Sequence, residues 1–193
     1  MAPCRRERVT FTGLRVLLTN ATISTRTGSE LYVWDLATAL LVRGHHPVVY
    51  APVLGQLARD LRSLTIPVVS DLRLVSAAPD VIHGHHNHEL MTALLHFPGV
   101  PAVRVCHGWA DEPVQQFPRI LRYVAVDHTV RDRMVSEWGV PADRVSVSLN
   151  FVDTSLPEYY YYQYSEYYAT PNPETDPVAS TAHHQQPRLT HPS

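Results

Sequence analysis

Residues 27–51 read TGSELYVWDLATALLVRGHHPVVYA, and their pattern predicts a helix followed by a strand. Thr27 and Glu30 have the spacing of a capping box, in which two side chains satisfy free backbone N–H groups of the first helical turn. Apolar residues then recur at helical spacing, and Gly44 can adopt the left-handed conformation that ends many helices. Residues 46–51 (HPVVYA) are mostly apolar, so we predict a strand there.

Short apolar runs alternate with helical patterns on both sides of this stretch. We predict further strands at residues 14–19, 67–70, 80–83, 102–106, 123–126 and 144–149, and further helices at residues 54–64, 89–96 and 129–138. The strands are continuously apolar, which is typical of a parallel sheet covered by helices on both faces. The expected fold is therefore α/β, a Rossmann-like doubly wound parallel sheet.

The composition changes abruptly near Ser155. Seven of the ten tyrosines lie within residues 159–168, and residues 157–193 contain only two aliphatic residues larger than alanine. Ordering such a segment costs on the order of 1.5 kcal/mol per residue in conformational entropy, with almost no aliphatic burial to offset it. We therefore expect a flexible N-terminus at residues 1–13, a folded domain at 14–156 and a disordered tail rich in tyrosine and proline at 157–193.

Composition and charge disfavour several classes of function. The formal net charge of −2 gives no support for a nucleic-acid partner. All 16 basic residues are arginine, which excludes a lysine Schiff base, a pyridoxal phosphate site and a Walker A loop. The motif G-x-G-x-x-G is absent, so a nicotinamide cofactor is disfavoured.

The sequence also points to a compartment. It shows no secretory signal and no run of about 20 apolar residues that could span a membrane. Its two cysteines, Cys4 and Cys106, cannot form a disulfide framework and indicate a reducing environment. We therefore expect a cytoplasmic protein without a transmembrane segment.

In a doubly wound fold, ligands bind in the loops at the carboxyl ends of the strands. The segment Thr27-Gly28-Ser29 would present free N–H groups and a positive helix terminus to a phosphate or hydroxyl, although it also fits a helix that is simply well capped. His107 follows the strand at 102–106, where it could bond a sugar hydroxyl or move a proton, or else cap the next segment. Asp127 follows the next predicted strand in the same way.

A cluster of histidines follows the predicted strand at 80–83. His83, His85, His86 and His88 lie within six residues and could supply metal ligands. A polar loop after a strand explains most of them without an ion, and no cysteine lies nearby. We therefore expect no metal site here.

Five stretches, taken in order, indicate a family. They are TGSELYVWDLATALLVRGHHPVVY at 27–50, PDVIHGH at 79–85, VPAVRVCHG at 100–108, YVAV at 123–126 and GVPADRVSVSLNFVD at 139–153. Over about residues 14–154 their order and spacing resemble the N-terminal domain of the retaining glycosyltransferases of family four, which have the GT-B fold.

The resemblance implies hexosyl transfer from a nucleotide-sugar donor to a glycan or small-molecule acceptor, without a cofactor or metal. It implies that this domain shapes the acceptor side, that the loop containing Gly28 approaches the donor phosphates, and that His107 lies near the transferred sugar as the catalytic candidate. The candidate substrate-binding residues are Thr27, Gly28, Ser29, His83, Gly108 and Asp127.

The chain departs from the family pattern at several places. Thr27 stands where the family often has a first glycine, and Phe151 replaces a turn glycine of the usual Asn-Gly-Val-Asp. The donor-binding domain, with its basic pair and its Glu-x7-Glu motif, would follow residue 153, but the tail contains neither. We therefore expect a truncated or frame-shifted product that is inactive alone. The alternative is a non-catalytic acceptor-binding module, or a partner of a separate donor-binding chain.

A domain separated from its partner would also expose apolar surface, so self-association is expected.

Overall fold

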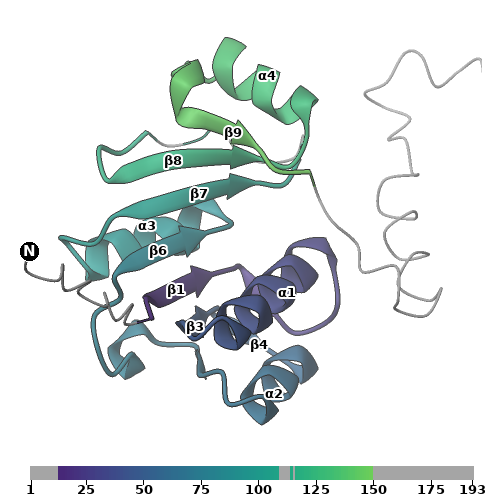
Figure 1. The fold of residues 1–193 in the computed structure, drawn as a ribbon, viewed down its shortest axis with the longest axis vertical. Coiled ribbons are helices and arrows are strands. Elements are labelled where there is room, and N and C mark those ends of the chain that lie inside the picture. The colour runs from purple at the N-terminus through teal and green to yellow at the C-terminus, as the bar shows by residue number, and fades with distance from the viewer. Residues whose placement is uncertain (1–12, 109–113, 115, 150–193) are drawn as a thin grey trace, which may run out of the picture. The chain divides into compact units, whose positions relative to one another are not determined.

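The computed structural model describes residues 13–108, 114 and 116–149. The predicted tail at 157–193 and almost all of the predicted N-terminal segment lie outside the described residues. The described residues form a seven-stranded sheet in the order β5-β3-β1-β6-β7-β8-β9 (Figure 1), and every neighbouring pair in it is parallel.

The elements follow one another as the alternating pattern predicts. The strands of the large sheet are β1 (Arg15–Thr19), β3 (His46–Tyr50), β5 (Val68–Val69), β6 (Val81–Gly84), β7 (Ala102–Cys106), β8 (Ile120–Ala125) and β9 (Val145–Val147). The helices are α1 (Gly28–Val42), α2 (Gln56–Ser63), α3 (Asn87–His96) and α4 (His128–Ser136), with 3-10 turns at Leu72–Leu74 and Ala142–Arg144. Two further short strands, β2 (Thr22–Ile23) and β4 (Val53–Leu54), pair with each other.

The order of the strands reverses at β1. The chain proceeds from β1 to β3 and β5 on one side, and then returns to place β6 on the other side of β1. This arrangement confirms the predicted doubly wound fold. It also places the expected ligand cleft at the carboxyl ends of β1 and β6, where the order reverses.

Two apolar clusters cover the two faces of the sheet. Alternate residues of β1 point to opposite faces: Leu17 belongs to the cluster that contains buried residues of α3 and α4, whereas Val16 and Leu18 belong to the cluster of α1 and α2. In Figure 1, α1 lies in front of the sheet and α3 behind it. Helices on both faces explain why the strands are continuously apolar in sequence.

Helix α1 begins and ends where the sequence predicts. Thr27 is its N-cap, the capping box with Glu30 is formed, and Gly44 has a φ of 79° just beyond the helix. Its buried face differs from the simple apolar stripe, because Val33 and Ala37 are fully buried, whereas Trp34 and three leucines of the helix are only partly buried at the margin of the cluster. The helix is apolar on several sides, so spacing alone did not identify its core face.

Most predicted boundaries differ from the observed ones by one to three residues. Strand β8 begins at Ile120, three residues before the predicted start, and β9 spans only Val145–Val147 of the predicted 144–149. The pair β2 and β4 was not predicted, because strands of two residues have no readable period. These differences leave the carboxyl ends of the central strands in place.

Candidate functional site

Three imidazoles lie in contact at the carboxyl ends of β6 and β7. Nδ1 of His83 is 3.2 Å from Nε2 of His85, and Nδ1 of His85 is 2.7 Å from Nε2 of His107. His83 belongs to β6, His85 follows it directly, and His107 is the first residue after β7. We call these three residues the histidine chain. It joins two of the predicted site residues, His83 and His107, through one that was not predicted.

The local structure explains this contact. His83 and His85 are two residues apart, so they project to the same face at the end of β6. Strand β7 lies parallel to β6, with Val103 beside His83, and the residue after β7 therefore reaches the same edge. Tyr32 of α1 contacts the rings: its ring centroid is 5.1 Å from that of His85 and 5.4 Å from that of His107, both edge-on. The histidine chain thus lies on the face of the sheet that α1 covers.

The histidine chain is held neutral. Burial lowers the pKa of His83 to about 4. Burial, together with the charges of His86 and Arg104, lowers the pKa of His107 to about 3. His85 is fully buried, and burial and the neighbouring imidazoles lower its pKa well below the usual value. At neutral pH these rings can therefore accept and donate hydrogen bonds without carrying charge.

The N-terminus of α1 reaches the same edge through Ser29. Its Oγ lies 3.4 Å from Nε2 of His86 and 3.4 Å from Nδ2 of Asn20, the residue after β1. The ring of His86 stacks near that of His107, with centroids 6.2 Å apart. Ser29, a predicted site residue, thus lies in the same group of side chains as His107.

Thr27 and Gly28, the two residues before Ser29, form the start of α1. Gly28 is the first helical residue, and the backbone N–H and hydroxyl of Thr27 donate to Glu30 Oε2 at 3.0 and 2.8 Å. Glu30 is fully buried and also accepts from the backbone N–H groups of Ser24 and Thr25, at 2.7 and 3.1 Å. Burial opposes its ionisation, but these hydrogen bonds outweigh that cost and hold its pKa at about 2. Glu30 therefore fixes the loop that leads to Ser29.

Gly108 and Asp127, the other two predicted site residues, have different surroundings. A side chain at Gly108 would meet no atom of the described residues within 4 Å. Asp127 is the N-cap of α4, and its Oδ1 accepts from the backbone N–H of Val130 and the hydroxyl of Thr129, both at 2.7 Å. These bonds explain Asp127 as a helix cap. The structure does not bring it into contact with the histidine chain through any described bond.

Arg104 is a buried cation that sequence reasoning missed; its side chain projects to the face of the sheet opposite the histidine chain, and its charge contributes to the low pKa of His107. It lies on β7, is 1% exposed, and its Nε and Nη1 have no hydrogen-bond partner among the described residues. It pairs in register with Gly84 of β6 and Tyr123 of β8, and the Tyr123 hydroxyl also lacks a described partner. The only signal in the sequence is an arginine within an apolar strand, VRVC, which breaks the expected pattern.

The geometry gives no support to the metal alternative. Within the ranges that the structure describes, no group of three histidine, cysteine, aspartate or glutamate side chains is arranged to hold an ion. Both ring nitrogens of His85 face other imidazoles, and His88 points its Nδ1 at Glu89 Oε1 at 3.3 Å.

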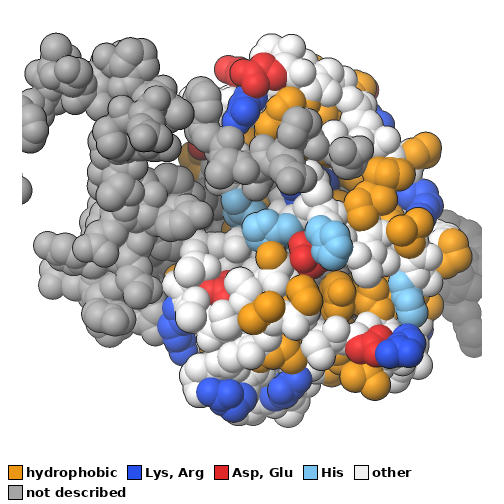
Figure 2. Space-filling model, turned by 180° about the vertical axis from the view of Figure 1, so that it is seen from behind, with side chains coloured by type: hydrophobic (Ala, Val, Ile, Leu, Met, Phe, Trp, Pro, Cys, Tyr) orange, Lys and Arg blue, Asp and Glu red, His pale blue; other side chains and the backbone are white. Residues whose placement is uncertain are grey.

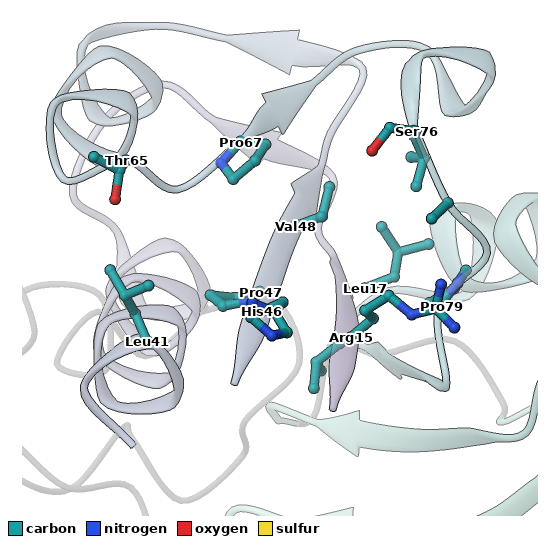
Figure 3. A pocket seen from close by; sticks show the side chains of 13 residues that line it. Arg15, Leu17, Leu41, His46, Pro47, Val48, Thr65, Pro67, Ser76 and Pro79 are labelled. Atoms are coloured by element: carbon teal, nitrogen blue, oxygen red, sulfur yellow. The ribbon is translucent and has the colours of Figure 1, made fainter. Parts of the chain in front are cut away.

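A separate pocket lies at the other end of the strands, where β1 and β3 begin. It has a volume of about 330 Å³ and is bounded by Arg15 and His46, the first residues of β1 and β3 (Figure 3). Its lining is mostly apolar, as with Leu41 and Pro67, and Arg15 is paired with Asp80 at 3.0 Å. This pocket is remote from the carboxyl edge, where ligands bind in doubly wound folds.

The surface of the described residues carries scattered apolar side chains. Val42 on α1 and Leu95 on α3 are the most exposed, at 85% and 75%. On the face shown in Figure 2, several histidine side chains gather in one patch. No helix among the described residues is long and apolar enough to cross a membrane. Self-association remains a prediction.

Residues 26–156 match the model of Glycosyltransferase Family 4. The chain belongs to this family. The resemblance found in the sequence is thereby confirmed, and the described domain is the N-terminal domain of a GT-B glycosyltransferase. Comparison with curated proteins gives no significant match.

Two solved structures share the fold. A glycosyltransferase from Rickettsia africae is similar with a TM-score of 0.58 and 15% identity, over 84% of this chain and 51% of the other. HepE from Anabaena, solved in complex with UDP and glucose, is similar with a TM-score of 0.55 and 16% identity, over 72% of this chain and 45% of the other. The chain thus spans about half the length of each of these two solved structures.

Proposed function

We propose that this domain forms the acceptor side of a glycosyltransferase and holds a hydroxyl-bearing glycan or small molecule at the histidine chain. One observation carries this proposal: the contact of His83, His85 and His107 at the carboxyl edge of the sheet, beside the N-terminus of α1. Membership of Glycosyltransferase Family 4 supports sugar transfer as the reaction. The complex of HepE with UDP and glucose supports a nucleotide sugar as the donor.

The chemistry of the site suits a sugar hydroxyl. A hydroxyl donates one hydrogen bond and accepts others, and a neutral imidazole offers one donor and one acceptor. His107 takes the role of contact to the transferred sugar or acceptor, with His86 near it and Ser29 in contact with His86. The N-terminus of α1, at Thr27 and Gly28, carries the positive end of the helix dipole and suits a donor phosphate.

The described site is rich in neutral groups and poor in accessible charge. Transfer from a nucleotide sugar requires stabilisation of the leaving diphosphate as its negative charge develops. Arg104, whose side chain projects to the opposite face of the sheet from His83, is a buried cation. We propose that the neutralising groups come from outside this chain, and that the 193-residue chain alone binds an acceptor without turning it over.

Calorimetric titration of the full chain with UDP-glucose, UDP and a panel of simple glycosides tests the proposal. We expect a glycoside to bind, and His107→Ala to weaken its binding about three- to tenfold, the effect of one lost hydrogen bond. His96→Ala is the matched control, because His96 is exposed at the far end of α3. Absence of binding by every compound, or equal affinity of His107→Ala and the wild type, would overturn the proposal.

A sugar-transfer assay with the same mixtures tests the proposal that the chain alone does not turn over an acceptor. No product is expected from the chain alone. Product formed by the purified chain would show that its own residues suffice to stabilise the diphosphate. Binding of a glycoside that persists without transfer when a separate donor-binding chain is supplied would favour the non-catalytic binding module instead.

A further inference from the structure

The two contacts within the histidine chain restrict where its hydrogens can lie. Each contact joins two ring nitrogens, and a hydrogen bond between them needs one N–H donor and one bare acceptor. Each neutral imidazole carries one N–H. His85 takes part in both contacts, through Nδ1 toward His107 and through Nε2 toward His83. It therefore donates in one contact and accepts in the other.

Only two arrangements satisfy both contacts. In the first, Nε2–H of His107 donates to His85 Nδ1, and Nε2–H of His85 donates to His83 Nδ1, so that all three rings carry hydrogen on Nε2. In the second, Nδ1–H of His83 donates to His85 Nε2, and Nδ1–H of His85 donates to His107 Nε2, so that all three carry hydrogen on Nδ1. Any mixed arrangement leaves two donors or two acceptors facing each other.

We propose that the histidine chain is tautomer-coupled, and that the buried His85 is a positioning residue which makes His107 and His83 carry hydrogen on the same ring nitrogen. This proposal rests on the proposed function in one respect only: the proposed function supplies the identity of the group that His107 contacts. The relation between the three rings follows from their own geometry.

The residues packed around the histidine chain favour this coupling. The contact between His85 and His107 is short at 2.7 Å, His85 is fully buried, and the ring of Tyr32 packs edge-on against both. Packing on this scale opposes a flip of the rings. Arg104 and His86 both disfavour a positive charge on the histidine chain, and burial raises the pKa of Tyr32, the titratable group in ring contact with it.

The coupling determines how His107 meets a ligand. With hydrogen on every Nε2, Nδ1 of His107 accepts a hydrogen bond; with hydrogen on every Nδ1, it donates one. The change from the first state to the second takes up one proton at Nδ1 of His107, shifts one proton across each contact, and releases one proton from Nε2 of His83 to water. Nδ1 of His107 can thus face a hydrogen-bond donor or an acceptor without movement of a ring.

Nuclear magnetic resonance of the full chain, labelled with ¹⁵N at histidine and free of ligand, tests the proposal. Correlations from the ring carbon-bound protons to both nitrogens identify which nitrogen carries hydrogen, and His83→Phe and His107→Phe assign the signals. We expect His83, His85 and His107 to show the same tautomer at neutral pH. Different tautomers among the three rings, or a positively charged ring, would overturn the proposal.

Two variants test the coupling itself. In His83→Phe the remaining pair, His85 and His107, should still share one tautomer. In His85→Phe the link is removed, and the tautomer populations of His83 and His107 should change from those of the wild type. If His85→Phe does not fold, the wild type and His83→Phe still decide the question. His96→Ala should leave all three signals unchanged, and loss of coupling in that control would contradict the account.

These experiments use no ligand. A mixed tautomer pattern therefore refutes the coupling and leaves the proposed function intact. A failed glycoside titration refutes the proposed function and leaves the coupling intact.

Discussion

Nδ1 of His85 lies 2.7 Å from Nε2 of His107, so a contact between two imidazoles joins the ends of β6 and β7 at the centre of the sheet. One partner, His85, is fully buried, and the other is the first residue after β7, at the carboxyl end of the strand. A ligand at the carboxyl edge would therefore meet a side chain whose orientation is set from inside the protein. Three predictions about the stability of the protein follow from the neutral histidine chain, from Glu30 and from Arg104.

The first concerns pH. The histidines of the unfolded chain bind protons near pH 6.5, whereas in the folded protein His83 does so near pH 4 and His107 near pH 3. The unfolded chain therefore binds more protons between these values, and the free energy of unfolding falls as the pH falls through this window. Between pH 6.5 and 5 the loss should be about 1.5 kcal/mol for each ring that stays neutral.

Urea unfolding at several pH values measures this slope. His107→Phe should reduce it, while His96→Ala, at an exposed position, should leave it as in the wild type. A free energy of unfolding that is constant from pH 6.5 to 5 would contradict the neutral histidine chain.

The second concerns Glu30, whose pKa lies at about 2 against an ordinary value of 4.5. A depressed carboxyl pKa contributes stability above the ordinary value, and that stability is lost as the pH falls toward 2. Glu30→Gln should therefore lower the free energy of unfolding by roughly 3 kcal/mol at pH 7, with a smaller difference at pH 3.

The same substitution on an exposed helix provides the control. Glu137 pairs with Arg133 at 2.9 Å across one helical turn, and Glu137→Gln should cost only about 0.3–0.5 kcal/mol. Equal effects of the two substitutions would show that the bonds of Glu30 to the loop do not stabilise the fold.

Much of this architecture could be predicted from the sequence. The capping box of Thr27 and Glu30 located α1, and the apolar run at 102–106 gave β7 with its observed bounds. These features are local, so a short window contains them. Strand β8 was predicted too short because Leu121 and Arg122 are exposed, and their mixed pattern hides the strand.

The site was only partly predictable for a different reason. The sequence shows four histidines at 83–88, but which of them point inward depends on the phase of β6 and on its register with β7. The sequence pattern therefore presents His85 only as a candidate metal ligand and Tyr32 only as a residue of a helix. Their contact with His107 is a tertiary relation that no single window contains.

The third prediction concerns Arg104. Two of its buried nitrogens lack a partner among the described residues, and an unsatisfied buried donor costs about 1–3 kcal/mol. Arg104→Met should therefore leave the protein as stable as the wild type or more stable. Removing the positive charge should also raise the pKa of His107, since that charge is one of the causes of its depression.

Arg119 offers a matched comparison. Its guanidinium donates to the carbonyl oxygens of Leu94, Phe97 and Val100 at 2.6–3.2 Å. Arg119→Met should destabilise the protein by about 1–3 kcal/mol, because those oxygens lose their donors. Thermal unfolding of both variants compares them, and a larger loss in Arg104→Met than in Arg119→Met would contradict the assignment of Arg104 as unsatisfied.

A crystal structure of the full chain soaked with the glycoside that binds best in calorimetry tests the central claim most directly. We predict a sugar hydroxyl within hydrogen-bond distance of the His107 ring, beside Ser29 at the N-terminus of α1. A glycoside bound instead in the pocket between Arg15 and His46, at the opposite edge of the sheet, would contradict the assignment of the histidine chain as the acceptor site.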